Sequence, residues 1–282
     1  MAWRQRTKLV LKRFLTSLLT TLLIGLVFGV AFSWWLIPKP SIAVLNISGV
    51  MSGQEFVDST LELIQQARSD RNIRAVVLKI DSPGGSVSAV EPIYLELLKL
   101  REAKPVVVSV GTVAASGGYY IAAPANYIYA EPTSTIGSVG VKVTLPEVET
   151  LDETTLTTGP FKSTGGSQRK VVGVLATAQK QFTSAVTSGR GAKLKLSTEE
   201  LARGEIYSGT EGLRNGLIDE IGTSLAAREK AASLAHIRNY RVTNLENETA
   251  SLSWLFESDA ARALLSERPL IPTYYYLYVE PE

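Results

Sequence analysis

Two glycine doublets, each placed just after a short β-branched run, constrain this chain most strongly. The first stands in Ser82–Gly85 after the apolar run 75–80, and the second stands in Ser116–Gly118 after the run 105–110. Glycine allows the backbone to approach a ligand closely and to point bare N–H groups at it. Two such turns beside one hydroxyl predict an acyl-transfer site with an oxyanion hole.

The sequence around the doublets alternates between expected strands and amphipathic helices. Short apolar runs predict strands at 41–51, 75–80 and 106–110. Apolar residues at helical spacing predict helices at 56–68 and 86–101, and Pro92 should kink or restart the second helix. This alternation is typical of βαβ units with right-handed crossovers and a mostly parallel sheet. Both doublets then fall at the carboxyl ends of strands, where open α/β sheets bind ligands.

The later sequence predicts smaller elements. We expect a short helix at 115–123, short strands within 127–144, and helices near 171–189 and 223–235. The polar stretch 147–168, rich in Thr, Ser and Gly, is expected to be exposed or mobile. The tyrosine-rich stretch 272–279 is interpreted as a packed strand, with a peptide-binding or interfacial surface as the alternative.

Composition narrows the chemistry. The chain has 282 residues, of which 45% are apolar and 20% charged, as in a globular protein of one or two domains. It has no cysteine, which excludes thiolate nucleophiles, disulfides and cysteine metal sites. The single histidine, His236, lies in helical sequence far along the chain from both doublets, so we expect a surface histidine and a different base for any serine nucleophile. A desolvated lysine can serve as such a base. We expect no metal and no cofactor.

The amino-terminal region has the pattern of a membrane anchor. Residues 1–13 carry five basic side chains and no acid, and residues 14–37 are an uncharged run of 24 residues. A span of about 20 apolar residues matches the hydrocarbon thickness of a bilayer, and the basic flank predicts that the amino terminus stays inside. The alternative, a cleavable signal peptide, needs an apolar core of only about 7–15 residues.

The charge balance fits this topology. The whole chain has a formal net charge of +2, and the basic segment 1–13 leaves the remainder at −3. The basicity therefore belongs to the membrane-flanking tail, where it suits anionic lipid. We expect no nucleic-acid partner.

Several motifs together resemble those of a known family. The chain is similar to the signal peptide peptidase A family, membrane-anchored bacterial Ser-Lys peptidases that share the ClpP/crotonase fold. The resemblance covers about residues 41–235, in family order, and rests on the segments 81–86 (DSPGGS), 115–120 (ASGGYY), 136–140 (IGSVG), 159–163 (GPFKS), 204–209 (GEIYSG) and 216–219 (GLID).

The resemblance implies a role for four residues. Ser116 is expected to be the nucleophile and Lys162 the general base, with the backbone N–H groups of Gly84 and Gly117 forming the oxyanion hole. It also implies an α/β fold of stacked, ClpP/crotonase-like βαβ units with a mostly parallel sheet, preceded by one transmembrane helix.

The expected organisation is a cytoplasmic basic tail at 1–13, a transmembrane anchor at 14–37, a peptidase domain at 41–240 and a carboxyl-terminal extension at 241–282. The resemblance implies a serine endopeptidase in the bacterial cytoplasmic membrane, with its catalytic domain on the extracytoplasmic side, that hydrolyses remnant signal peptides and other membrane-associated peptides.

Because this chain has one copy of the unit that long family members carry twice, we expect a homo-oligomer, an octamer, whose active sites are shared between subunits. Two other functions are compatible with the sequence: a catalytically silent membrane scaffold that binds peptides, and an acyl-CoA enzyme of the same fold.

Overall fold

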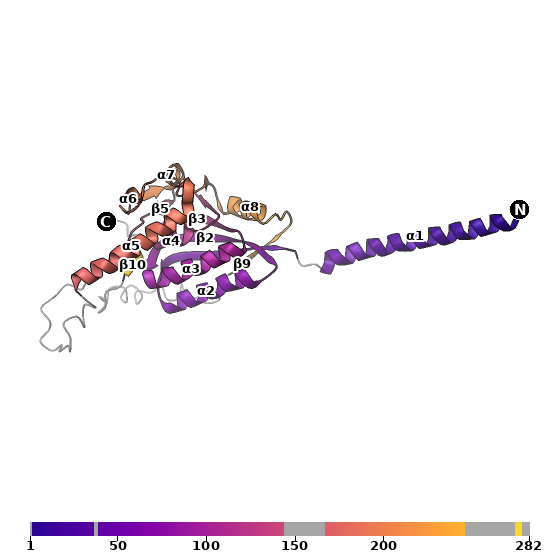
Figure 1. The fold of residues 1–282 in the computed structure, drawn as a ribbon, viewed down its shortest axis with the longest axis horizontal. Coiled ribbons are helices and arrows are strands. Elements are labelled where there is room, and N and C mark those ends of the chain that lie inside the picture. Colours follow the sequence, from indigo (N-terminus) through magenta and orange to yellow (C-terminus); the bar gives the residue numbers. More distant parts are fainter. Residues whose placement is uncertain (1, 37–38, 144–166, 246–273, 278–282) are drawn as a thin grey trace. The chain divides into compact units, whose positions relative to one another are not determined.

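The computed structural model describes residues 2–36, 39–143, 167–245 and 274–277, and the chain divides into the units 1–39 and 40–282. The first unit contains helix α1 (Ala2–Leu36), drawn in indigo in Figure 1. Large apolar side chains of α1 are exposed, among them Phe14, Leu22 and Phe28. Within the described residues, no helix offers an apolar stretch long enough to span a bilayer.

The second unit is built on one ten-stranded sheet. Its strands are β1 (Ser41–Met51), β2 (Ile73–Ser86), β3 (Val106–Ala115), β4 (Tyr127–Ala130), β5 (Thr135–Gly137), β6 (Lys142–Val143), β7 (Ile206–Ser208), β8 (Glu220–Ile221), β9 (Arg241–Leu245) and β10 (Tyr274–Leu277). The main path runs β6-β10-β2-β3-β4-β8, while β1 pairs with β2 and β9, and β5 pairs with β3 and β7.

Most strand pairs in this sheet are parallel. Strands β1, β2, β3 and β4 each pair in parallel with the next strand of the sheet, as the alternation of strands and helices predicted. The antiparallel pairs join β7 to β5 and β10 to both β2 and β6. The prediction of an α/β fold with a mostly parallel sheet is therefore confirmed.

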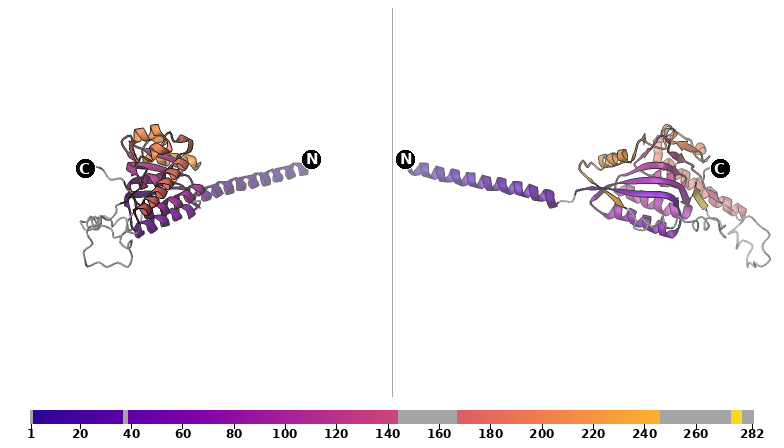
Figure 2. Two further views of the ribbon diagram at one scale, coloured as in Figure 1. Left: turned by 60° about the vertical axis from the view of Figure 1, so that its left-hand side comes forward. Right: turned by 180° about the vertical axis from the view of Figure 1, so that it is seen from behind.

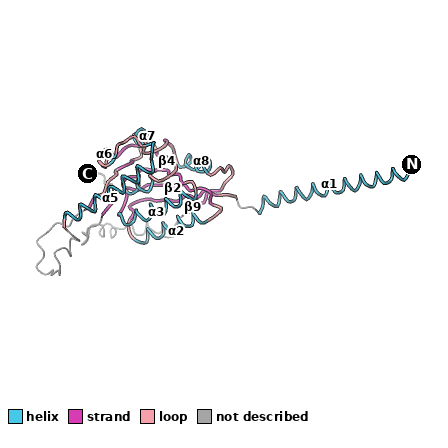
Figure 3. The backbone as a smooth tube through the Cα atoms, viewed as in Figure 1, coloured by secondary structure: helices cyan, strands magenta, loops and turns pink. Residues whose placement is uncertain are grey.

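Helices cover both faces of the sheet, as the cyan and magenta tube of Figure 3 shows. The helices of this unit are α2 (Gln54–Ser69), α3 (Val87–Ala103), α4 (Gly117–Ala122), α5 (Gln168–Arg190), α6 (Thr198–Leu201), α7 (Gly209–Asn215) and α8 (Ser224–Leu234), with one 3₁₀ turn at Gly191–Lys193. Figure 2 shows α2 and α3 along one face and α8 on the other.

The core is divided between these two faces because successive strand residues point in opposite directions. On β2, Leu78 belongs to the core cluster on the face covered by α2, α3 and α4, whereas the adjacent Val77 belongs to the cluster on the face covered by α8. Both side chains are almost fully buried, and burying one such side chain contributes about 1.5–3 kcal/mol. Because both faces are covered, these strands are continuous apolar runs instead of alternating ones.

Two central strands are longer than the sequence predicted. Strand β2 continues through the first glycine doublet to Ser86, because Val50 and Met51 of β1 pair there with Gly84 and Gly85. Strand β3 continues to Ala115, the residue before the second doublet. The doublets therefore lie on the sheet or directly at its end, which fixes their backbones more firmly than free loops would.

Helix α3 also differs from expectation. It continues through Pro92 as one element and does not restart there. Val90 and Ile93, on either side of the proline, are fully buried, so packing against the sheet holds the helix together despite the missing N–H donor.

The carboxyl-terminal part of the chain contributes two strands to this sheet. Strand β9 pairs in parallel with β1, and β10 lies between β2 and β6. The prediction of a strand in the tyrosine-rich stretch 272–279 is confirmed for 274–277. The polar stretch 147–168, expected to be exposed or mobile, lies almost entirely outside the described residues.

Candidate active site

Ser116 occupies a sharp turn between the end of β3 and the start of α4. Its backbone has φ of 50° and ψ of −120°, a conformation that non-glycine residues rarely adopt and that costs on the order of 1–3 kcal/mol. The Ser116 N–H donates to the carbonyl of Gly137 at 2.8 Å, and the Ser116 carbonyl accepts from the N–H of Tyr120 at 2.9 Å. The side chain is buried. A strained serine at a strand-to-helix turn is the arrangement that serine hydrolases use to present a nucleophile.

The second glycine doublet allows α4 to begin against β2. A Cβ atom on Gly118 would lie 2.5 Å from the carbonyl oxygen of Ser82, so only glycine fits at this position. Gly117 opens α4, and the first N–H groups of a helix have no acceptor within the helix. The contact of Gly118 with Ser82 brings the two doublets side by side, as the sequence predicted. The backbone amide of Gly117 directly follows Ser116, the expected nucleophile.

Gly84, the other expected oxyanion donor, has φ of 116°, which favours glycine. Its N–H donates to the Ser82 hydroxyl oxygen at 3.1 Å, and this hydroxyl donates in turn to the carbonyl of Gly49 at 2.6 Å. This role of Ser82 was not predicted from the sequence. Its position two residues before the glycine, where a serine side chain can bond to a nearby backbone amide, was the available signal.

The segment that follows β5 lies beside the nucleophile. The Ser116 hydroxyl donates to the carbonyl of Gly140 at the long distance of 3.5 Å. Ser138 has a left-handed φ of 51°, and its N–H donates to the carbonyl of Glu205 at 2.8 Å. Lys162, the expected general base, lies outside the described residues.

His236 terminates α8. It has a left-handed φ of 55°, its N–H donates to the carbonyl of Ser233, and the N–H of Ile237 donates to the carbonyl of Ala232. This is the Schellman pattern that closes a helix. The side chain is exposed, in agreement with the expectation of a surface histidine.

Aromatic side chains hold α4 in place. Tyr120 stacks on Tyr94 of α3 with ring centroids 4.5 Å apart, and Phe182 of α5 meets it edge-on at 4.9 Å. Tyr119 is fully buried, and its hydroxyl donates to the carbonyl of Leu217 at 2.8 Å. Burial raises the pKa of Tyr119 above its ordinary value, which keeps its hydroxyl a donor.

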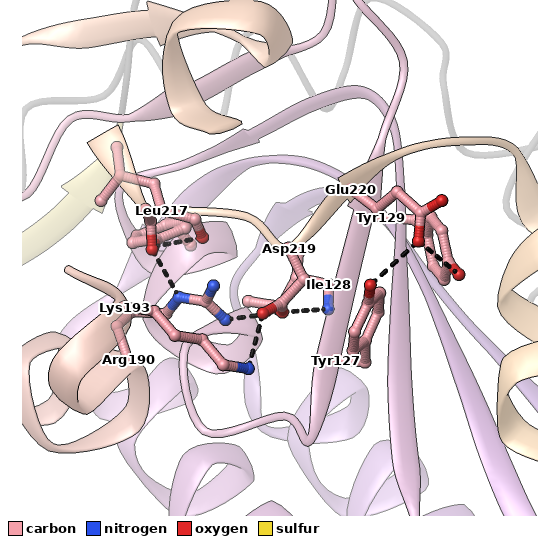
Figure 4. Close-up of polar contacts among 10 residues, drawn as sticks. Tyr127, Ile128, Tyr129, Arg190, Lys193, Leu217, Asp219 and Glu220 are labelled. Atoms are coloured by element: carbon pink, nitrogen blue, oxygen red, sulfur yellow. Dashed lines mark hydrogen bonds and ion pairs between the residues drawn. The ribbon is translucent and has the colours of Figure 1, made fainter. Parts of the chain in front are cut away.

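A buried ion-pair network lies behind α4, at the carboxyl end of α5 (Figure 4). The guanidinium of Arg190 donates to Asp219 at 2.9 Å and to the carbonyl of Gly216 at 2.9 Å. Lys193 donates to the other carboxylate oxygen of Asp219 at 2.6 Å, and the N–H of Ile128 donates to the carboxylate at 2.8 Å. The network joins α5 to β4 and to the segment before β8.

The segment before β8 also contains Leu217, whose carbonyl accepts the hydrogen bond from Tyr119 of α4. The ion-pair network and α4, the helix that begins after Ser116, are therefore both attached to this segment. Asp219 lies in the motif 216–219 that resembles the family, but no role was predicted for it from the sequence. Burial favours a raised pKa for Asp219, but the hydrogen bonds and charges of Arg190 and Lys193 outweigh it and hold that pKa below its ordinary value.

We expect Asp219→Asn to lower the free energy of unfolding by about 3 kcal/mol, because it leaves the buried Arg190 without its counter-charge. The ion pair is fully present above the unfolded-state pKa of about 4, and its contribution is lost as pH falls through the lower folded-state pKa. The difference between wild type and variant, measured by urea unfolding, should therefore shrink in acid.

Glu220 provides a matched control, because it is the next residue, carries the same charge and is exposed, and a glutamine there can still accept the hydrogen bonds that the Tyr127 and Tyr129 hydroxyls donate. Glu220→Gln should change the free energy of unfolding by no more than about 1 kcal/mol. Equal effects of the two substitutions would show that the Asp219 network does not stabilise this part of the fold.

The described residues contain no cluster of three or more His, Asp or Glu side chains that could hold a metal ion. A mostly parallel α/β sheet with a strained serine at the turn between a strand and a helix defines the class of Clp-protease-like folds. A Clp protease family model matches residues 46–136, and the model described as peptidase family S49 matches residues 99–238. The chain belongs to peptidase family S49.

Curated relatives agree with this assignment. Protease 4 of Salmonella typhi is 34% identical over 249 residues, which are 80% of this chain and 40% of that protein. A putative protease of Synechocystis sp. is 30% identical and is matched over 75% of its length by 70% of this chain. A putative signal peptide peptidase SppA of Enterococcus faecium is 29% identical over 69% of this chain and 61% of its own length. The chain thus spans less than half of Protease 4.

Among solved structures, a membrane-bound stomatin-specific protease in complex with a substrate peptide superposes with a TM-score of 0.54. The match covers 79% of this chain and 100% of that one, at 18% identity. At this identity the likeness shows the shared fold.

Proposed function

We propose that this protein is a membrane-anchored serine endopeptidase that uses Ser116 and Lys162 as a catalytic dyad. The observation that carries the proposal is the strained, buried Ser116 between the amino end of α4 and the glycine-lined end of β2. Membership of peptidase family S49 supports the reaction class.

The first step is attack of the Ser116 oxygen on a peptide carbonyl carbon. Neutral Lys162 takes the hydroxyl proton as the bond forms, and the N–H groups of Gly84 and Gly117 receive the developing oxyanion. The Gly84 N–H is already held in place by Ser82, and a charged oxyanion is a stronger acceptor than that neutral hydroxyl. Loss of one oxyanion donor reduces the rate by roughly 10²–10³ in comparable enzymes.

The second step breaks the bond between carbon and nitrogen. Lys162, now protonated, gives its proton to the leaving amine, and the acyl group remains on Ser116. A water molecule, deprotonated by the same lysine, then attacks the ester carbonyl. The carboxylate product leaves, and the proton returns to the serine oxygen.

The proposed substrates are remnant signal peptides and other membrane-associated peptides. The similarity to the Enterococcus faecium relative, a putative signal peptide peptidase, supports this substrate class. The bacterial cytoplasmic membrane is the proposed location, with residues 1–13 inside and the catalytic unit outside. The uncharged run 14–37 with its basic flank supports this topology, and lipid is the corresponding partner.

We further propose a homo-oligomer, an octamer, in which Lys162 of one subunit serves Ser116 of its neighbour. The family resemblance supports this proposal, because long family members carry two copies of the unit and this chain matches 40% of Protease 4. Mixing inactive Ser116→Ala with inactive Lys162→Ala subunits tests it, because mixed particles recover activity only if the sites are shared.

The proposed function predicts covalent labelling of one residue. A serine-reactive acylating probe should modify Ser116 of the full chain in detergent, located by peptide mass spectrometry, because the hydroxyl is activated and faces the oxyanion donors. Digestion of a peptide library should yield products that depend on this residue. A probe that labels another residue, or none, favours a silent peptide-binding scaffold, and specific binding of coenzyme A favours an acyl-CoA enzyme.

A further inference from the structure

The starts of the neighbouring parallel strands β9, β1, β2 and β3 lie together at one edge of the sheet, which we call the amino-terminal edge. Arg241, the first residue of β9, is level with Ser41 of β1, and Ser41 is level with Ile73 of β2. The segment before β3 joins them, because the N–H of Val76 donates to the carbonyl of Pro105 at 2.9 Å. Side chains from these four starts therefore share one surface.

Exposed arginines gather at this edge. Arg71 and Arg74 lie at the start of β2, and Arg238 and Arg241 lie at the start of β9. All four side chains are exposed. Among the residues that the structure describes, no carboxylate is within ion-pair distance of any of them. Their charges are therefore available to a partner.

Positive charge is crowded at the amino-terminal edge. Lys104, before β3, donates to the carbonyls of Ala67 and Asp70 at 2.6 Å each. Burial lowers the pKa of Lys104, Asp70 partly offsets this effect, and the nearby charge of Arg74 lowers the pKa again. The acidic side chains in the segments that lead into β2 and β3 are Asp70 and the exposed Glu102, so the cations outnumber the anions.

The carboxyl-terminal edge of the sheet has exposed glutamates instead. Glu55 follows β1, Glu131 follows β4, and Glu205 precedes β7, the antiparallel partner of β5. Basic residues near the carboxyl ends of helices often complement the helix dipole, and α2 and α3 end at the amino-terminal edge. That explanation does not apply to Arg74 and Arg241, because both lie on strands.

We propose that the amino-terminal edge binds the phosphate groups of an anionic lipid surface. Guanidinium groups pair with phosphate through two parallel hydrogen bonds, and cations near an anionic membrane are attracted to it. The inference rests on the proposed membrane anchor. Three residues, 38–40, separate the uncharged run 14–37 from β1, and three extended residues span at most about 10 Å. The anchor thus keeps this edge within reach of lipid headgroups.

Binding by this edge sets the height of the proposed active site above the lipid. Because the starts of the parallel strands face the headgroups, the strands run away from the membrane. Ser82, which Gly118 contacts, lies eight residues after Arg74 on β2, a distance of about 25 Å along a strand. A peptide that reaches Ser116 therefore needs about eight extended residues outside the bilayer. The substrate class is narrowed to segments that protrude from the membrane.

The test measures the distance of the edge from the lipid without turnover. The chain has no cysteine, so a fluorophore on Asn239→Cys, at an exposed position between two of the arginines, marks one place. The full chain, with Ser116→Ala, is inserted into nanodiscs of phosphatidylcholine with or without phosphatidylglycerol, and energy transfer to a headgroup-labelled lipid is recorded. We expect more transfer in the anionic nanodiscs, and high salt should abolish the difference because it screens exposed charges.

Two triple variants make the test specific. The first replaces three arginines of the edge, and the second, its matched control, replaces three exposed arginines elsewhere: Arg71→Gln/Arg74→Gln/Arg238→Gln and Arg169→Gln/Arg203→Gln/Arg214→Gln. The edge variant should lower the ratio of docked to undocked protein by on the order of 10², since each basic residue near an anionic surface changes it about fivefold. The control should keep the transfer of the parent chain. Equal transfer in both lipids, or equal loss in both variants, would overturn the proposal.

The anchor is tested separately by the same samples. Insertion into nanodiscs of phosphatidylcholine alone does not need the arginines, so a chain that fails to insert contradicts the proposed anchor. Flotation with phosphatidylglycerol vesicles then decides the docking proposal, because both triple variants keep the basic segment 1–13. The control variant should float with the vesicles more than the edge variant, and equal flotation of the two would refute the proposal.

Discussion

Ser116→Ala is expected to reduce peptide hydrolysis by on the order of 10⁶ while the protein stays folded. The substitution removes the only oxygen that can form the acyl-enzyme but keeps the left-handed backbone, because alanine and serine have the same Cβ. Among the residues that the structure describes, the hydroxyl makes one long hydrogen bond, to the carbonyl of Gly140 at 3.5 Å, so its loss should change the free energy of unfolding by less than about 1 kcal/mol. Hydrolysis of a fluorogenic peptide and urea unfolding measure the two quantities.

Two further substitutions make this test specific. Ser109, buried on strand β3, which leads into the turn at Ser116, provides the matched control, and Ser109→Ala should retain full activity. Ser116→Gly should be as inactive as the alanine variant but more stable than it by about 1 kcal/mol, because glycine adopts the positive φ without strain. Turnover in either Ser116 variant would exclude this residue as the nucleophile.

Much of the fold follows from local sequence, and the reason is physical. The first half of the run 41–51 and the runs 75–80 and 106–110 are apolar enough to be covered on both faces, and parallel strands in an α/β sheet are covered in that way. The glycine doublets were informative because, where two backbones approach closely, a residue with a side chain does not fit and only glycine can occupy the position. Gly118 against Ser82 is such a contact.

The remaining features depend on partners far apart in the chain. The hydroxyl of Ser82 bonds to Gly49, 33 residues earlier, and Asp219 receives Arg190 and the amide of Ile128, 91 residues earlier. No periodicity or local spacing encodes these pairs, because each forms only when the sheet and its helices have assembled. The strand direction of β10 could not be predicted either, since a tyrosine-rich run fits a parallel or an antiparallel neighbour equally well.

The long-range contacts converge on the nucleophile. Ser82 orients the amide of Gly84, and the segment before β8 holds Tyr119, three residues after Ser116. Strain at one serine persists only where the surrounding structure determines the backbone from several sides. The packing of α4 against β2, α3 and α5 supplies that constraint, which explains why a short helix of six residues can carry the site.

Lys162→Ala is expected to reduce hydrolysis by about 10²–10⁴ or more, because a general base that takes the hydroxyl proton would be missing. With wild type, kcat/KM should rise with pH and reach a plateau once the base is unprotonated, and this rise should be absent from the residual activity of the variant. The double variant Ser116→Ala/Lys162→Ala should be no less active than Ser116→Ala alone, since residues that act as a unit are not additive.

Lys170, exposed in the first turn of α5, provides the matched control. Lys170→Ala removes the same charge from a neighbouring position of the chain and should leave both kcat/KM and its pH dependence unchanged. A pH profile that is the same in Lys162→Ala as in wild type would assign the base to another group. Because the single histidine is exposed at the end of α8 and closes that helix, the search would then turn to the other lysines and to the carboxylates.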